Sequence, residues 1–164
     1  NKSATANLRS EAARRAIAPE RLVFAPFVEV GDHLARHAHA DLFLDSFYFN
    51  AHTTASDALW AGLPVLTKIG ETFAGRVAAS LLTAIGMPEL IAPDEVRYEE
   101  IALDLARSPV KLAALKAKLA VHKRSQQLFD TARFARHIEQ AYLAIYARAL
   151  AGQAPADIVI PPMG

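Results

Sequence analysis

Two hydrophobic patterns alternate along the first 92 residues of the chain. Short apolar runs of two to four residues are separated by stretches of about ten residues in which apolar side chains recur at helical spacing. We predict strands at Leu22–Ala25, Asp41–Leu44, Val65–Thr67 and Leu90–Ile91. We predict helices at Ala6–Ala16, Val30–His39, Thr53–Ala61 and Ala74–Ile85. Buried strands that alternate with such helices are typical of βαβ units, so we expect an α/β fold with a doubly wound parallel sheet.

After Pro93 only the helical pattern continues. We predict helices at Asp94–Arg107, Ser108–His122 and Asp130–Ala151. The last helix carries an apolar stripe made of Phe134, Ile138, Tyr142, Ile145 and Leu150. We therefore divide the chain into a ligand-binding domain over residues 1–129, a long helix over residues 130–151 and an extended tail over residues 152–164.

Composition excludes several classes of protein. With 52% hydrophobic and 21% charged residues, the 164-residue chain is globular rather than disordered. A net charge of +1 without a basic stripe gives no support for a nucleic-acid or membrane surface, and the lack of cysteine excludes disulfides and thiolate metal sites. No apolar run or signal-peptide pattern suggests membrane insertion, so we expect a cytoplasmic protein. The first residue is Asn1 and not Met, and a predicted helix begins within a few residues of it, so we expect a piece of a longer protein.

The segment from Phe49 to Thr67 contains the most informative candidate site. A polar loop ending in His52 leads into a helix that starts with Thr53 and Thr54. A helix start combines unpaired N–H groups with the positive end of the helix dipole, and the hydroxyls and the imidazole would add polar groups there, which suits a phosphate. A threonine that only caps the helix explains the same pattern equally well.

Other polar residues fall near the carboxyl ends of the predicted strands, where ligands of doubly wound sheets bind. His33 and Arg36 share one helix face and could contact a planar base, unless that face is simply solvated. Asp57 lies one helical turn beyond Thr53 and could accept hydrogen bonds from a ribose.

The remaining candidates have weaker support. In the loop after the third strand, Glu71 or Thr72 could cap the next helix, Gly75 permits close backbone approach and Arg76 could reach an anion. The histidine-rich run that includes His37 and His39 lacks partners at ligand spacing, so we expect no metal site. No nucleophile with a matching base is evident.

Three segments carry a resemblance to a known family. They are RLVFAPFVEVGDHLARHAHADLFLDS, NAHTTASDALWAGLPVLTKIGETFAGRVAASLL and FDTARFARHIEQAYLAIY. Together they closely resemble the carboxyl-terminal catalytic half of the O-GlcNAc transferases, a family that includes the Spindly-type proteins and bacterial relatives, and we expect the bacterial type. Its members have the GT-B architecture, in which two Rossmann-like domains face each other across a cleft, usually behind tetratricopeptide repeats. The resemblance covers about residues 7 to 148.

The resemblance implies roles for individual residues. His52, Thr53 and Thr54 match the diphosphate-binding motif of the family, and Asp57 matches its ribose-binding acid. Phe27, Val28, His33 and Arg36 match the residues beside the uracil. Val30 stands where the better-studied animal members have a lysine, which leaves the nucleotide preference open.

The same resemblance implies that no catalytic residue lies in this chain. The base and the lysine on the leaving phosphate would lie upstream of Asn1, and residues 130–151 would cross back toward that missing amino-terminal GT-B domain. No cofactor or metal is expected.

We therefore expect the donor-binding half of an inverting transferase that moves N-acetylglucosamine from UDP-GlcNAc to Ser or Thr hydroxyls of proteins. Alternatives are a GT-B enzyme with another donor such as GDP-fucose, a non-catalytic nucleotide-sugar-binding module, and an α/β packing domain in which the threonines only cap a helix.

Overall fold

The computed structural model describes residues 1–162 and separates into two compact units, Asn1–His33 and Leu34–Gly164. The last two residues of the predicted tail, 163 and 164, lie outside the described part. In the first unit, α1 (Lys2–Arg14) is capped by Asn1, whose side-chain oxygen accepts a hydrogen bond from the Ala4 N–H at 2.9 Å. The short 3-10 helix η1 (Pro19–Arg21) follows α1.

The predicted strand Leu22–Ala25 is wrong. This segment has no regular secondary structure, and Val23 within it is 88% exposed. The guanidinium of Arg9 covers the ring of Phe24 at 5.4 Å from its centroid. A strand needs a neighbour for its backbone hydrogen bonds, and residues 1–33 contain no other extended segment paired with this one. The apolar run alone could not reveal that a pairing partner is missing.

A parallel sheet forms the centre of the second unit, as predicted. It contains β1 (Phe43–Leu44), β2 (Val65–Lys68) and β3 (Ile91–Ala92) in the order β1-β2-β3. The register pairs Phe43 with Val65 and Thr67 with Ile91. Because parallel strands end at the same edge of a sheet, the loops that follow β1 and β2 are brought together there.

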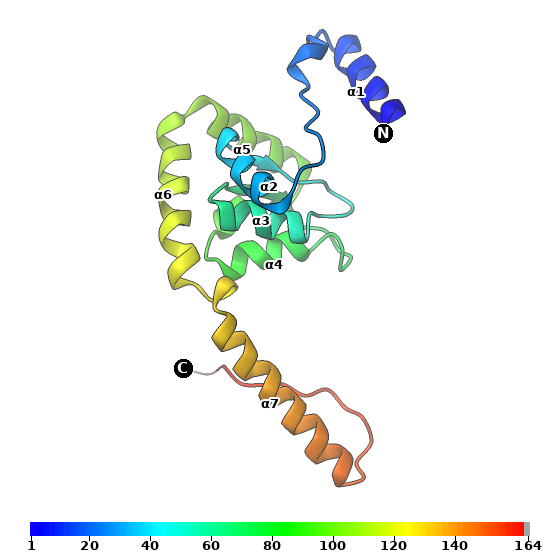
Figure 1. Ribbon diagram of the computed structural model, residues 1–164, viewed down its shortest axis with the longest axis vertical. Helices are drawn as coiled ribbons and strands as arrows, with labels where there is room; N and C mark the ends of the chain where they lie inside the picture. Colours follow the sequence, from blue (N-terminus) through cyan, green and yellow to red (C-terminus); the bar gives the residue numbers. More distant parts are fainter. Residues whose placement is uncertain (163–164) are drawn as a thin grey trace. The chain divides into compact units, whose positions relative to one another are not determined.

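Helices pack against this sheet, and further helices follow in the chain (Figure 1). The helices that follow the first unit's η1 in the chain are α2 (Val30–Arg36), η2 (His37–His39), α3 (Thr53–Ala61), α4 (Val77–Ala84), η3 (Pro88–Leu90), α5 (Glu95–Arg107), α6 (Pro109–Ser125), η4 (Gln127–Phe129) and α7 (Thr131–Leu150). Helices α3, α4 and α5 all pack against β2, and α6 packs against α3 and α5. The helix α2 lies across the boundary between the two units.

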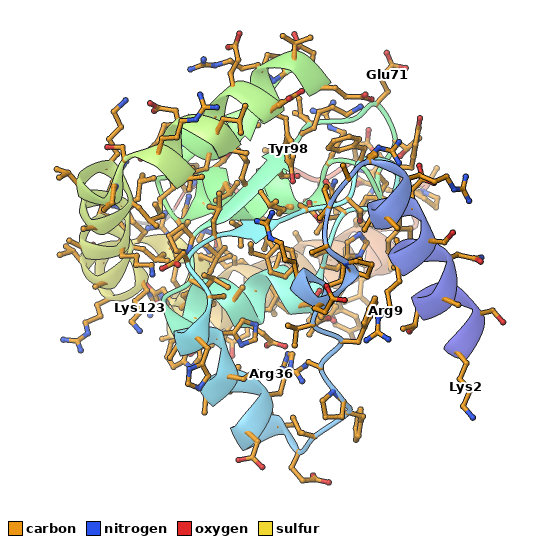
Figure 2. The ribbon with its side chains drawn as sticks, turned by 90° about the horizontal axis from the view of Figure 1, so that it is seen from above. Lys2, Arg9, Arg36, Glu71, Tyr98 and Lys123 are labelled. Atoms are coloured by element: carbon orange, nitrogen blue, oxygen red, sulfur yellow. The ribbon has the colours of Figure 1, made fainter. Side chains whose placement is uncertain are left out.

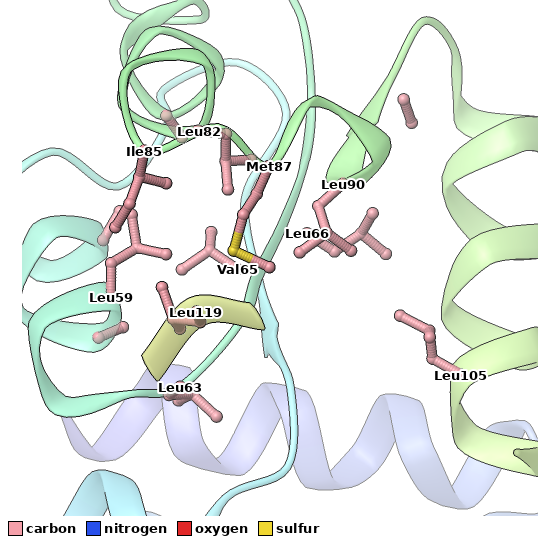
Figure 3. Packing of buried hydrophobic residues seen from close by; sticks show 14 of the residues in the cluster. Leu59, Leu63, Val65, Leu66, Leu82, Ile85, Met87, Leu90, Leu105 and Leu119 are labelled. Carbon is pink, nitrogen blue, oxygen red and sulfur yellow. The ribbon is translucent and has the colours of Figure 1, made fainter. Parts of the chain in front are cut away.

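The core is built around β2, whose first three residues are fully buried. Val65 lies on the side of Leu59 and Ile85, whereas Leu66 lies on the side of Leu90 and Leu105 (Figure 3). Successive side chains of a strand point to opposite faces, so apolar residues cover both faces of the sheet. This arrangement confirms the doubly wound reading of the pattern.

Helix starts follow the sequence signals in most places. Asp94, Ser108 and Asp130 cap α5, α6 and α7 through their side-chain oxygens. The start of α4 differs from the prediction, since Thr72 accepts a hydrogen bond from the Gly75 N–H at 3.2 Å and closes a turn before the helix. Neither Glu71 nor Thr72 therefore caps α4, which begins only at Val77.

The helix α7 buries none of its residues. Its exposed large apolar side chains are Phe134, Ile138, Tyr142, Leu143, Ile145, Tyr146 and Leu150. An exposed apolar stripe of this length is uncommon in a complete soluble protein and typically marks an interface.

Candidate functional site

The loops that follow β1 and β2 meet at the carboxyl edge of the sheet. The Asn50 N–H donates to the Ala74 carbonyl at 2.9 Å, and the Gly70 N–H donates to the Gly75 carbonyl at 2.7 Å. A Cβ atom on Gly70 would lie 3.1 Å from the Gly75 oxygen, so the close backbone approach predicted for Gly75 is confirmed. The helix α3 starts directly after the first of these two loops.

The start of α3 is polar and uncapped. His52 occupies the N-cap position without a side-chain cap hydrogen bond, so Thr53 and Thr54 are the first two helical residues and neither caps the helix. Both threonines are exposed, and their hydroxyls have no hydrogen-bond partner within residues 1–162. The first backbone bond of the helix runs from the Ser56 N–H to the His52 carbonyl at 3.1 Å, which leaves the N–H groups of Thr53 and Thr54 without a partner inside the helix.

Aromatic rings hold the imidazole of His52 in one orientation. The ring of Phe49 stacks on it with centroids 4.8 Å apart and planes inclined by 14°. Phe73, from the loop after β2, meets its edge at 6.1 Å. The polar groups at the start of α3 therefore belong to an ordered surface.

A hollow of about 390 Å³ lies against this surface. Its lining residues are Phe43, Leu44, Asp45, Ser46, Phe49, Asn50, Ala51, His52 and Thr54. The hollow thus extends from the end of β1 to the first turn of α3, where N–H groups, hydroxyls and an imidazole can meet an anion without a further cation.

The other predicted site residues are distributed over both units. Asp57 is half-buried on α3, one turn beyond Thr53, and Arg36 is half-buried just before η2, which packs against α3. Phe27, Val28 and His33 belong to the first unit, where Phe27 is 96% exposed. Their assignment to a base remains a prediction.

Sequence reasoning missed Asp45, the residue directly after β1. Its side chain is buried and accepts three hydrogen bonds, two from backbone N–H groups of the following loop and one from the Thr67 hydroxyl. Its backbone carbonyl accepts a hydrogen bond from the Tyr98 hydroxyl at 3.1 Å. An aspartate at the end of an apolar strand was the available signal, but nothing in the pattern distinguished it from an ordinary turn residue.

Tyr98 lies in the interior of the second unit, whereas Glu71 lies at the edge of the molecule (Figure 2). Burial, with a smaller contribution from the negative charge of Asp45, raises the pKa of Tyr98 to about 12. The phenol therefore stays neutral and keeps donating to the end of β1 at any ordinary pH.

Two further properties of the described part concern metal ions and membranes. Within residues 1–162, no group of three or more His, Cys, Asp or Glu side chains could hold a metal ion. None of the helices in that range is at once long and apolar enough for a bilayer crossing.

Comparison with known proteins decides the family. The model of glycosyl transferase family 41 matches residues 2–138. The chain belongs to this family. A solved structure, a lysine-to-methionine mutant of the O-GlcNAc transferase of Thermobaculum terrenum, has the same fold, with a TM-score of 0.78 and 34% identity over 87% of this chain and 27% of that one.

Similar curated proteins come from plants and animals. The chain is 36% identical over 148 residues to the probable UDP-N-acetylglucosamine--peptide N-acetylglucosaminyltransferase SEC of Arabidopsis thaliana, covering 90% of this chain and 15% of that protein. It is 36% identical over 133 residues to the UDP-N-acetylglucosamine--peptide N-acetylglucosaminyltransferase of Caenorhabditis elegans, covering 81% and 12%. The probable SPINDLY enzyme of Oryza sativa subsp. japonica is 32% identical over 148 residues, covering 90% and 16%. The chain thus spans only 12% to 16% of these relatives.

Proposed function

We propose that this family 41 chain is the donor-binding half of an inverting glycosyltransferase that moves N-acetylglucosamine from UDP-GlcNAc to Ser or Thr hydroxyls of proteins. One observation carries the proposal: the uncapped start of α3 offers two threonine hydroxyls and a held imidazole beside a hollow at the carboxyl edge of a parallel sheet. The names of the relatives support the donor and the protein acceptor.

In this proposal the start of α3 binds the diphosphate of the donor. Negative charge grows on the diphosphate as the bond to the sugar carbon breaks, and fixed N–H dipoles and hydroxyls stabilise that charge without a bound metal. Asp57 would accept hydrogen bonds from the ribose, while Phe27, Val28, His33 and Arg36 would contact the uracil.

The groups that deprotonate the acceptor hydroxyl are expected in another part of the protein. The chain spans about 15% of the SEC relative, which supports an additional GT-B domain and tetratricopeptide repeats as partners of this half. The exposed apolar stripe of α7 supports a contact with such a domain. A cytoplasmic location belongs to the same proposal.

Binding of UDP to the full-length protein tests this proposal. We expect His52→Ala to weaken UDP binding about tenfold in isothermal calorimetry, because a hydrogen bond to a charged phosphate contributes on the order of 1.5–3 kcal/mol. His39→Ala is the matched control, since His39 is an exposed histidine on η2. An unchanged affinity of His52→Ala for UDP would disprove the assignment of the diphosphate to the start of α3.

The same titration separates the competing functions. Tighter binding of GDP than of UDP would indicate a different donor, such as GDP-fucose. Tight UDP binding without sugar transfer or donor hydrolysis by the full-length protein would indicate a non-catalytic binding module.

A further inference from the structure

We propose that Asp45 is a positioning residue, which sets the start of α3 in the geometry that receives the donor diphosphate. This inference rests on the proposed function, but it concerns a residue that lies outside the HTT motif. Asp45 acts through the loop of residues 46–51 and is not expected to touch the donor itself.

The carboxylate of Asp45 ties both ends of that loop to the sheet. One oxygen, Oδ1, accepts hydrogen bonds from the N–H groups of Ser46 at 2.8 Å and of Ala51 at 2.7 Å. The other oxygen, Oδ2, accepts a hydrogen bond from the Thr67 hydroxyl of β2 at 2.7 Å. Since Ala51 directly precedes His52, the carboxylate determines where the N-cap residue of α3 lies.

Burial makes these contacts effective. Asp45 is only 5% exposed, and charge-assisted hydrogen bonds are stronger where water is excluded. Thr67 is fully buried on β2, so the carboxylate is attached to the central strand of the sheet. The Tyr98 hydroxyl holds the backbone carbonyl of the same residue from α5.

Within residues 1–162, the side-chain hydrogen bonds that the loop residues themselves donate do not reach the sheet. The Ser46 hydroxyl donates to the Phe49 carbonyl at 2.6 Å, and the Asn50 amide donates to the Ser46 carbonyl at 2.9 Å, so both bonds stay inside the loop. Asn50 is 1% exposed, yet its side-chain oxygen has no hydrogen-bond partner in the described part. Lys68 of β2 lies over the rings of Phe47 and Tyr48, at 4.8 Å and 5.9 Å from their centroids. In the described part, the side-chain hydrogen bonds that tie the loop to β2 run through Asp45.

Asp45→Asn in the full-length protein tests the inference. The substitution keeps the shape of the side chain but removes the charge that strengthens its hydrogen bonds. Asp41→Asn is the matched control, because it makes the same chemical change just before β1, where the side chain is 78% exposed and pairs with Lys116. Thr67→Val is a second variant, which removes one of the three hydrogen bonds and keeps nearly the same shape.

Two measurements separate positioning from general stability. The affinity for UDP is compared with that for uridine, which lacks the diphosphate. We expect Asp45→Asn to weaken UDP binding about tenfold and uridine binding less than twofold, and Thr67→Val to produce a smaller change in the same direction. Hydrogen–deuterium exchange should accelerate in residues 49–56 of Asp45→Asn and stay unchanged in Asp41→Asn.

An equal loss of UDP and uridine affinity, or no loss of either, would overturn the inference. If Asp45→Asn does not fold, the same comparison with Thr67→Val decides. A wild-type protein without affinity for UDP would instead overturn the proposed function, and the exchange data alone would then show whether Asp45 orders this segment.

Discussion

Gly62 ends α3 in a left-handed conformation, with a φ of 91°. A Cβ atom there would meet nothing within 4 Å, so the effect of a side chain at this position is purely a matter of backbone conformation. We expect Gly62→Ala to lower the free energy of unfolding by about 1–2 kcal/mol, measured by urea denaturation.

The control for this prediction is Gly31→Ala in α2. A Cβ atom on Gly31 also has open space, but the residue lies inside a helix without a positive φ. Alanine should therefore leave the stability unchanged or raise it by up to about 1 kcal/mol. Equal losses for both variants would contradict the conformational explanation.

At the scale of single residues, the sequence predicted the residues at the start of α3 but left their role open. His52, Thr53 and Thr54 could be found because two threonines stood between a polar loop and an apolar helix. The structure shows that neither threonine caps the helix, which favours the phosphate interpretation. Asp45 could not be found, because its importance comes from Thr67, which lies 22 residues away in the chain.

At the scale of elements, Tyr98 fastens α5 to the end of β1. Burial raises the pKa of its hydroxyl to about 12, above the value of 10.0 expected for an exposed tyrosine. The unfolded chain therefore loses this proton before the folded protein does. The contribution to stability is complete below pH 10 and is lost as the pH rises toward 12.

We expect this loss to reach about 2 kcal/mol by pH 12, because each unit of pKa difference corresponds to 1.36 kcal/mol. Tyr98→Phe should be less stable at neutral pH, through loss of the hydrogen bond to Asp45, and its stability should decline less between pH 10 and 12. Urea denaturation at several pH values would measure both effects. A parallel decline in wild type and variant would contradict this role of Tyr98.

Most elements followed from local signals. The bounds of α3 agree with the prediction, and Asp94 and Ser108 start their helices as side-chain caps. The strand at Leu22–Ala25 failed because pairing is a property of two segments, whereas the hydrophobic pattern describes only one.

At the scale of the whole molecule, α7 is the element with the largest unexplained apolar surface. If its stripe contacts another domain in the full-length protein, Ile145 is buried there. Ile145→Ala should then lower the stability of the full-length protein by about 2 kcal/mol or more, measured by thermal or urea unfolding.

Arg136→Ala is the control on the same helix, because Arg136 is exposed and lies outside the apolar stripe. Its effect should stay within about 0.5 kcal/mol. Ile145→Ala without a measurable effect would mean that α7 faces solvent in the full-length protein as well.

The sequence by itself determined the α/β class, the order of most helices and strands, the residues at the start of α3 and the resemblance to a transferase family. These depend on local periodicity, on capping residues and on motifs that are contiguous in the chain. The tertiary structure alone decided that the first apolar run is not a strand, that the start of α3 is uncapped, and that Asp45 joins the loop before it to the centre of the sheet. Each of these depends on which distant segments meet, and burial gives those contacts their strength.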